Sequence, residues 1–194
     1  MEISEKKLIK HAKKGDRSAQ AKIVQKYERM IYNLGLRLLG NQEEAECTLQ
    51  ETFLKVLESL TKFKEDSQLS TWIYRIATNQ ALMRLRSRKR KYVSLPLEDE
   101  IELKDYTEVS QSFAASPLED LLNSELKEKM NASIELLSPK YKSIFILKDI
   151  EGLSLKEISE ILEMSIPAVK SNLHRARLFL REKLSGYISG KSTK

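Results

Sequence analysis

The chain has 194 residues, a formal net charge of +6 and a pI near 9.2, a balance that favours a polyanionic partner. Hydrophobic residues make up 41% of it, enough for real cores, but no apolar run approaches the roughly 18 residues that span a bilayer, and the N-terminus lacks the apolar core of a signal peptide. The single cysteine, Cys47, excludes an internal disulfide, and with only two histidines a zinc site is not expected, so we expect a cytoplasmic protein without metal or cofactor.

Residues 1–95 are predicted to form an N-terminal helical domain. Residues 4–14 have a short amphipathic pattern, and Asp16 is then placed to cap a second helix whose apolar residues keep a 3.6-residue period. Gly35 lies inside that period, whereas most other glycines and prolines lie at boundaries. Residues 42–61 predict a third helix with one apolar side.

A polar loop precedes a fourth, longer helix, which Ser70 or Thr71 opens. We expect Trp72 and Met83 to face the core of this domain and Tyr74 to be exposed. The helix ends in six cations within eight positions: Arg84, Arg86, Arg88, Lys89, Arg90 and Lys91.

This basic block follows aromatic and amide side chains, notably Phe63 and Asn79. The combination suits single-stranded nucleic acid, because bases stack on aromatic rings while cations track the backbone. An unstacked base also presents its Watson–Crick edge to an amide such as that of Asn79. The alternative is a solvated helix end whose cations complement the helix dipole, although six cations exceed that need.

The composition changes sharply at residues 96–117, which hold six acidic residues against one lysine. No helical period persists there, so this segment is predicted to be a flexible acidic linker between two helical domains. Fully extended, it could span at most roughly 70 Å. Residues 118–194 are then predicted to form a C-terminal domain, which begins with helices over 118–137 and 139–150.

The end of the chain has the pattern of a helix-turn-helix, whose second helix enters the major groove of DNA. Ser154 and Glu157 predict a capping box, residues 163–165 a short turn, and Pro167 suits the first turn of the following helix. That last helix has an apolar stripe, and its other positions carry Lys170, Ser171, His174, Arg175, Arg177 and Arg181. The alternative is an ordinary amphipathic helix with a solvated basic side.

Four blocks, taken in order, resemble those of bacterial sigma factors of the extracytoplasmic-function group, and the resemblance covers nearly the whole chain. They are residues 44–56, 63–79, 137–154 and 168–177. The resemblance implies an all-α protein with two helical domains joined by an acidic flexible linker, the C-terminal domain containing the helix-turn-helix. It implies a subunit that binds core RNA polymerase, directs it to promoters and promotes DNA melting, with no catalytic residues of its own.

The resemblance also implies roles for individual residues. Contacts to core polymerase would come from Glu46, Gln50, Glu51 and Phe53. The melted −10 element would be bound by Phe63, Ser70, Asn79, Arg84, Arg86 and Arg88. The duplex −35 element would be read by Lys170, Ser171, His174, Arg175 and Arg177. The linker would run through the RNA exit path of polymerase, and an anti-sigma factor, often membrane-anchored, would sequester the protein, which does not itself insert into a membrane.

Two places depart from the family pattern. Cys47 and Thr48 replace the usual Asp and Leu in the polymerase-binding helix. Pro167, Ala168 and Asn172 replace the common Gly, Thr and Arg at the recognition helix, so the preferred −35 sequence should differ from the family's usual one.

Three other classes of function compete with this interpretation. A polymerase-independent helix-turn-helix regulator would bind a palindrome by itself, but it leaves the second basic block and the linker unexplained. A nucleic-acid enzyme finds no support in any metal-binding carboxylate cluster, glycine loop or nucleophile motif. An adaptor that binds only protein would leave the basic helix faces without a role.

Overall fold

The computed structural model describes residues 5–92 and 123–191, and within those ranges every regular element is helical. The first range contains α1 (Glu5–Lys13), α2 (Arg17–Leu39), α3 (Gln42–Ser59), the 3-10 turn η1 (Leu60–Lys62) and α4 (Leu69–Tyr92). The second contains α5 (Asn123–Glu135), α6 (Pro139–Phe145), the π-helical turn η2 (Ile146–Ile150), α7 (Leu155–Leu162) and α8 (Ile166–Lys191). The all-α prediction is confirmed, and the predicted linker, residues 96–117, lies outside the described residues.

None of the helices in the described ranges is long and apolar enough to cross a membrane.

Helices α2 and α3 form a closely packed pair. Asp16 caps α2 as predicted, its carboxylate accepting hydrogen bonds from the backbone of the first turn at 2.9 and 3.2 Å. A Cβ at Gly35 would lie 3.3 Å from the Cα of Ala45 on α3, so the glycine in the middle of α2 is explained by the close approach of the two backbones. Gly40 then ends α2 in the left-handed region with φ of 66°.

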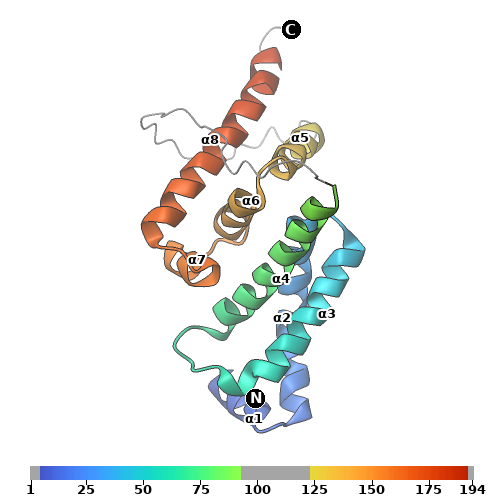
Figure 1. Cartoon of the computed structure of the whole chain (residues 1–194), viewed down its shortest axis with the longest axis vertical. Coiled ribbons are helices and arrows are strands. Elements are labelled where there is room, and N and C mark those ends of the chain that lie inside the picture. The colour runs from blue at the N-terminus through green and yellow to red at the C-terminus, as the bar shows by residue number, and fades with distance from the viewer. Residues whose placement is uncertain (1–4, 93–122, 192–194) are drawn as a thin grey trace.

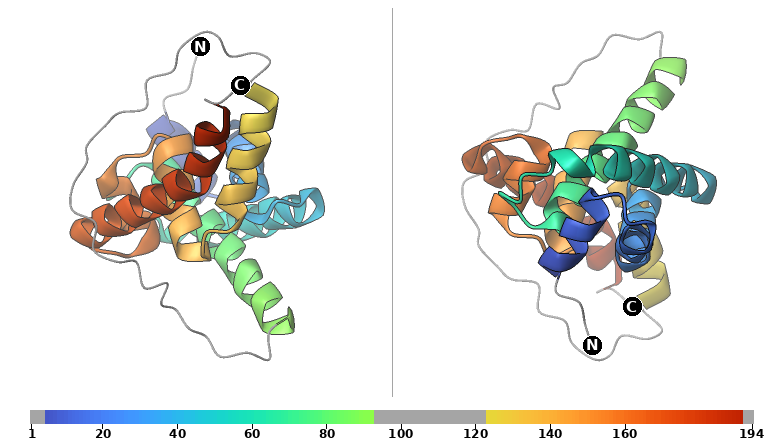
Figure 2. Two further views of the ribbon diagram at one scale, coloured as in Figure 1. Left: turned by 90° about the horizontal axis from the view of Figure 1, so that it is seen from above. Right: turned by 90° about the horizontal axis from the view of Figure 1, so that it is seen from below.

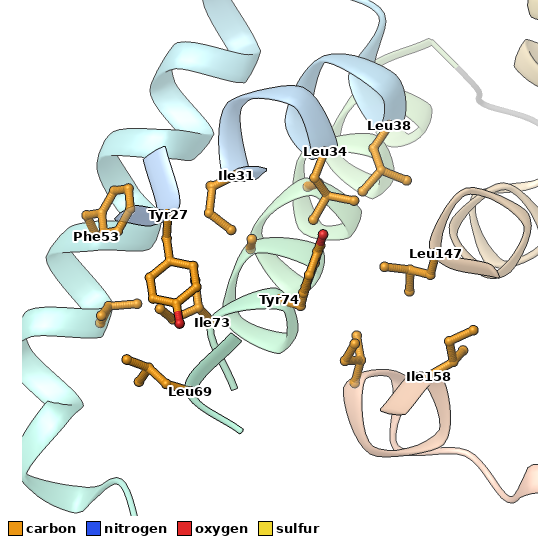
Figure 3. Packing of buried hydrophobic residues seen from close by; sticks show 14 of the residues in the cluster. Tyr27, Ile31, Leu34, Leu38, Phe53, Leu69, Ile73, Tyr74, Leu147 and Ile158 are labelled. Atoms are coloured by element: carbon orange, nitrogen blue, oxygen red, sulfur yellow. The ribbon is translucent and has the colours of Figure 1, made fainter. Parts of the chain in front are cut away.

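The N-terminal core lies where α2, α3 and α4 meet. Ile31, Leu34 and Ile73 have no exposed surface, and Phe53 of α3 packs into the same cluster (Figure 3). Burial of such side chains is the main source of stability in a domain of this size, because each contributes roughly 1.5–3 kcal/mol.

Helix α4 also packs against the C-terminal part of the chain. It lies between the α2–α3 pair on one side and α6 and α7 on the other (Figure 1). Buried residues from both parts join one continuous cluster, in which Leu147 and Ile158 lie on the side of α4 that carries Tyr74 (Figure 3).

Two predictions about α4 are wrong, and the packing explains both. Tyr74, expected to be exposed, has only 6% of its surface accessible because the C-terminal part covers that side of the helix. Met83, expected in the core, is 58% exposed because no other described helix covers its side of α4. Trp72 is partly buried against the core, in line with the prediction.

A polar contact links the two parts beside this apolar interface. The Tyr74 hydroxyl donates to Oε2 of Glu151 at 2.8 Å, and Arg37 of α2 forms an ion pair with the other oxygen of the same carboxylate. Glu151 directly follows η2, whose wider turn ends the predicted helix over 139–150. Burial, and then the hydrogen bond to Glu151, raise the pKa of Tyr74, so the phenol stays protonated at neutral pH.

Candidate nucleic-acid interface

The helix-turn-helix is formed by α7 and α8, and its local signals are confirmed. The Ser154 Oγ accepts from the Glu157 backbone N–H at 3.2 Å, and the Glu157 carboxylate accepts from the Ser154 backbone N–H at 2.8 Å, which completes the capping box. Hydrogen bonding to Ser154 lowers the pKa of Glu157, which favours the ionised carboxylate that accepts the backbone hydrogen bond of the box. Glu163 ends α7 with a left-handed φ of 53°, and α8 begins three residues later.

One side of α8 is fixed in the protein interior. Val169 and Leu173 belong to the cluster shared with α4, and Ala176 and Leu180 pack beside Phe145 of α6. The side turned away from these contacts exposes four of the five predicted duplex-reading residues, Lys170, Ser171, His174 and Arg175. The structure therefore brings these four side chains together on one accessible surface.

Arg177, the fifth predicted residue, has a partner inside its own domain. Its guanidinium donates two hydrogen bonds to the Asp149 carboxylate, from Nε at 3.0 Å and from Nη2 at 2.5 Å. The Asp149 hydrogen bonds raise the pKa of Arg177 and hold its planar group against η2. Asn172 is buried, so this departure from the family pattern falls on the inner side of α8.

The exposed side of α4 carries Asn79, Met83 and Arg86, which share one side because they are spaced at i, i+4 and i+7. The C-terminal end of α4 projects beyond the helices around it in both views of Figure 2. An exposed methionine beside the amide that is predicted to contact a base was not expected from the sequence, because the helical period placed Met83 with the core residues. An apolar side chain at this position could support an unstacked base.

The other predicted single-strand residues have different surroundings. Phe63 is 95% buried, so the prediction that it contacts DNA directly does not fit its position. Its ring lies 5.0 Å from that of Trp72, and it shapes the loop from inside. Ser70 is nine residues before Asn79, hence about 180° away around α4, so the structure does not bring these two side chains together.

Two of the three predicted arginines at the end of α4 form ion pairs with other helices. Arg84 pairs with Glu51 at 2.6 Å, and Arg88 pairs with Glu44 and also donates to the Leu39 carbonyl at 3.0 Å. These pairs tie α4 to α3 and to the end of α2. Arg86 is exposed and has no ion-pair partner in the described part of the chain.

Of the predicted polymerase-binding residues of α3, some are also exposed and others are engaged in contacts within the protein. Glu46 and Gln50 are exposed, whereas Glu51 is engaged by Arg84. Phe53 is 93% buried, so its predicted surface contact is corrected to a role in the core. Its neighbour Leu54 is 61% exposed and follows Gln50 by one turn, so it was the apolar residue to expect at this surface.

A metal centre finds no support in the described ranges, where no three His, Cys, Asp or Glu side chains lie close enough to hold an ion.

Comparison with known proteins gives family matches to both parts of the chain. Residues 23–91 match the model of Sigma-70 region 2, and residues 127–180 match that of Sigma-70, region 4. The chain is 40% identical over 187 residues to the ECF RNA polymerase sigma factor SigW of Bacillus subtilis (strain 168), covering 95% of this chain and 98% of that protein. It is 28% identical over 177 residues to the RNA polymerase sigma-H factor of Pseudomonas aeruginosa, covering 89% and 90% of the two chains.

Two solved structures share the fold. CnrH, in complex with the cytosolic domain of CnrY, has a TM-score of 0.66 at 18% identity, covering 95% of this chain and 99% of that one. The sigma factor RpoE of Bartonella quintana, in complex with the anti-sigma factor NepR, has a TM-score of 0.61 at 20% identity, covering 85% and 96%.

Proposed function

Because the chain belongs to the extracytoplasmic-function group of the sigma-70 family, a group of non-enzymatic transcription initiation factors, we propose that three separate surfaces divide its work with RNA polymerase. The exposed side of α8 reads the duplex −35 element, the exposed side of α4 holds the melted −10 element, and the exposed side of α3 binds core polymerase. The observation that carries the proposal is the accessible set on α8, Lys170, Ser171, His174 and Arg175, opposite a fully packed apolar side. Domains over residues 1–95 and 118–194, joined by the linker 96–117, remain part of this proposal.

Duplex reading is assigned to α8 because its chemistry matches the major groove. Arginine donates a pair of hydrogen bonds to a guanine edge, and lysine neutralises phosphate. The helix is held rigidly by its buried stripe, and rigid support gives a reading helix a fixed docking angle. Arg177, held by Asp149, orients the segment between α6 and α7 and reaches DNA only through the exposed part of its guanidinium.

Arg175→Ala is expected to weaken binding by about 1–3 kcal/mol at one position of the −35 element, because a lost bidentate contact affects the base that it read. Lys170→Ala is the matched comparison, since loss of a phosphate contact weakens binding evenly across sequences. Both are measured as holoenzyme affinity for duplexes mutated one base pair at a time. An even loss for Arg175→Ala would reassign it to phosphate.

The packing of the two parts against each other supports a closed form of the free protein. The reading residues on α8 and α4 are already exposed in it, so closure leaves these residues uncovered. In the closed form, Glu157 and Glu160 of α7 line a hollow of about 630 Å³ together with Phe63 and Gln68 from the loop before α4. These carboxylates would repel a DNA strand that approached the loop before α4. We infer that docking on polymerase separates the two parts and thereby moves the carboxylates of α7 away from this loop.

Tyr74→Phe is expected to shift the free chain towards the open form by about 10- to 150-fold, because a hydrogen bond to a charged group contributes about 1.5–3 kcal/mol. Energy transfer between a dye on the exposed Cys47 and a second dye introduced with Ser185→Cys measures the separation. Tyr27→Phe is the matched control, because Tyr27 is a buried tyrosine bound to Glu5 within the N-terminal part. Equal opening in both variants would refute this role of Tyr74.

The family also supports a proposal about location and further partners. We propose that the chain works in the cytoplasm, where polymerase and promoters are, and that an anti-sigma factor holds it until release. One of the two solved structures, the sigma factor RpoE bound to the anti-sigma factor NepR, supports this proposal. The acidic linker is proposed to enter the RNA exit path.

Mobility shifts with and without core polymerase discriminate this function from its rival. The proposal expects tight, sequence-specific promoter binding in the presence of polymerase and at most weak binding by the free chain. A polymerase-independent regulator would instead bind a palindrome as the free chain, with a half-site spacing of about 34–36 Å.

A further inference from the structure

Helix α1 and the turn that follows it carry an exposed row of cations that neither the duplex-reading nor the polymerase-binding surface includes. We propose that Lys7, Lys10 and Lys14, here called the α1 cation row, bind phosphates of the separated promoter strand next to the −10 site. The inference rests on the proposed function and extends the single-strand surface from α4 to the start of the chain.

Contacts between α1 and the loop before α4 place the row at the border of that site. The Lys13 Nζ donates to the Phe63 carbonyl and to the Glu65 carboxylate, each at 2.7 Å, and lies 5.5 Å from the centre of the Phe63 ring. Phe63 in turn contacts Trp72, which lies two helical turns before Asn79 on the same side of α4. These contacts hold α1 against the loop before α4 and against Trp72, about 10 Å along α4 from the amide assigned to the unstacked base.

The row lies on the outer side of α1. Ile9 and Ala12 are 4% and 2% exposed and fix the inner side against the core. Lys7 and Lys10 lie on the opposite side of the helix, Lys14 follows four residues later in the turn after α1, and all three are exposed.

These lysines lack the carboxylate partners that three nearby cations have. Lys13, Arg84 and Arg88 are already neutralised by carboxylates. No member of the α1 cation row forms an ion pair with another residue in the described ranges, and Glu5, the one acid of α1, is taken by Lys26 and Tyr27.

The simplest alternative is a solvated row that complements the negative end of the helix dipole. That effect is confined to the last turn and accounts for Lys10 and Lys14 but not for Lys7, which lies in the first turn of α1. Cations spaced about one turn apart match a polyanion that runs along the helix better than they match a single small anion.

The test uses the full chain with Lys7→Gln, Lys10→Gln and Lys14→Gln combined, assembled with core polymerase. The probe is a fork template whose non-template strand is single-stranded across the −10 element. Each lost phosphate contact lowers the salt slope by about 0.7, so the slope should fall by about 2 and affinity at 0.1 M salt by roughly 10- to 100-fold. Affinity for the −35 duplex and for core polymerase should stay unchanged.

A second triple variant controls for net charge. Lys127, Lys129 and Lys140 are exposed lysines in the C-terminal part, and changing all three to glutamine removes the same charge. Equal loss with this variant would overturn the proposal in favour of general electrostatic attraction. Loss of affinity for core polymerase in the α1 variant would overturn it in favour of a protein-binding surface. Absence of promoter binding by the wild-type holoenzyme would instead contradict the proposed function itself.

Discussion

Asn79→Ala is expected to lower open-complex formation by about 5- to 150-fold while leaving affinity for the −35 duplex unchanged. The amide lies on the exposed side of α4, far along the chain from α8, and a side-chain amide paired with a base edge contributes about 1–3 kcal/mol. Capture of unstacked bases offsets a few kcal/mol of unstacking, so its loss acts on melting rather than on duplex binding. Permanganate reactivity of unpaired thymines measures open-complex formation, and a separate binding titration measures affinity for the −35 duplex.

The control for this variant is Asn131→Ala, which removes an exposed amide from α5 in the C-terminal part. It should leave permanganate reactivity at the wild-type level. If Asn79→Ala weakened duplex binding and melting equally, the division of labour between α4 and α8 would be wrong.

Leu54→Asp is expected to weaken binding to core polymerase by at least about 30-fold, since an apolar contact is lost and a carboxylate must be buried in its place. Leu54 is 61% exposed on α3, one turn after Gln50, and no packing in the described structure explains an exposed leucine there. Titration of fluorescently labelled core polymerase measures the affinity, and helical content by circular dichroism checks that the variant is folded.

Leu136→Asp provides a matched control, because Leu136 is 62% exposed but lies in the C-terminal part of the chain. Similar losses from both substitutions would indicate a general effect of the added charge and would argue against a polymerase-binding surface on α3.

Local signals in the sequence predicted the helix boundaries well. Asp16 at the start of α2 and the Ser154–Glu157 capping box depend only on residues within one turn, so the chain's own neighbours determine them. The apolar stripe of α8 was equally visible, because one helix contains the whole pattern. Four of the five duplex-reading candidates accordingly share an exposed surface.

Contacts between distant segments could not be predicted in the same way. Tyr74 is buried because Glu151, 77 positions later, and the helices around it cover α4. Arg84 and Arg88 looked like free cations in a basic run, yet acids on α3 neutralise them. A helical period identifies the residues that share one side of a helix, but it does not show whether another element packs against that side. For this reason Met83 was assigned to the core.

At the polymerase-binding surface, too, the sequence did not show which of two neighbouring apolar residues is exposed. Phe53 and Leu54 are adjacent and both apolar, and composition favours the larger aromatic ring as the contact residue. The packing of α3 against α2 and α4 decides between them, because it turns Phe53 inward and leaves Leu54 outside.

The most direct test of the account is transcription by purified core polymerase, with and without this chain, on a library of promoter fragments, with the 5′ ends of the transcripts mapped. The account predicts start sites that depend on the chain and that share two sequence elements, one in the −35 and one in the −10 region. Transcripts that are identical with and without the chain, together with no detectable complex with core polymerase, would contradict it.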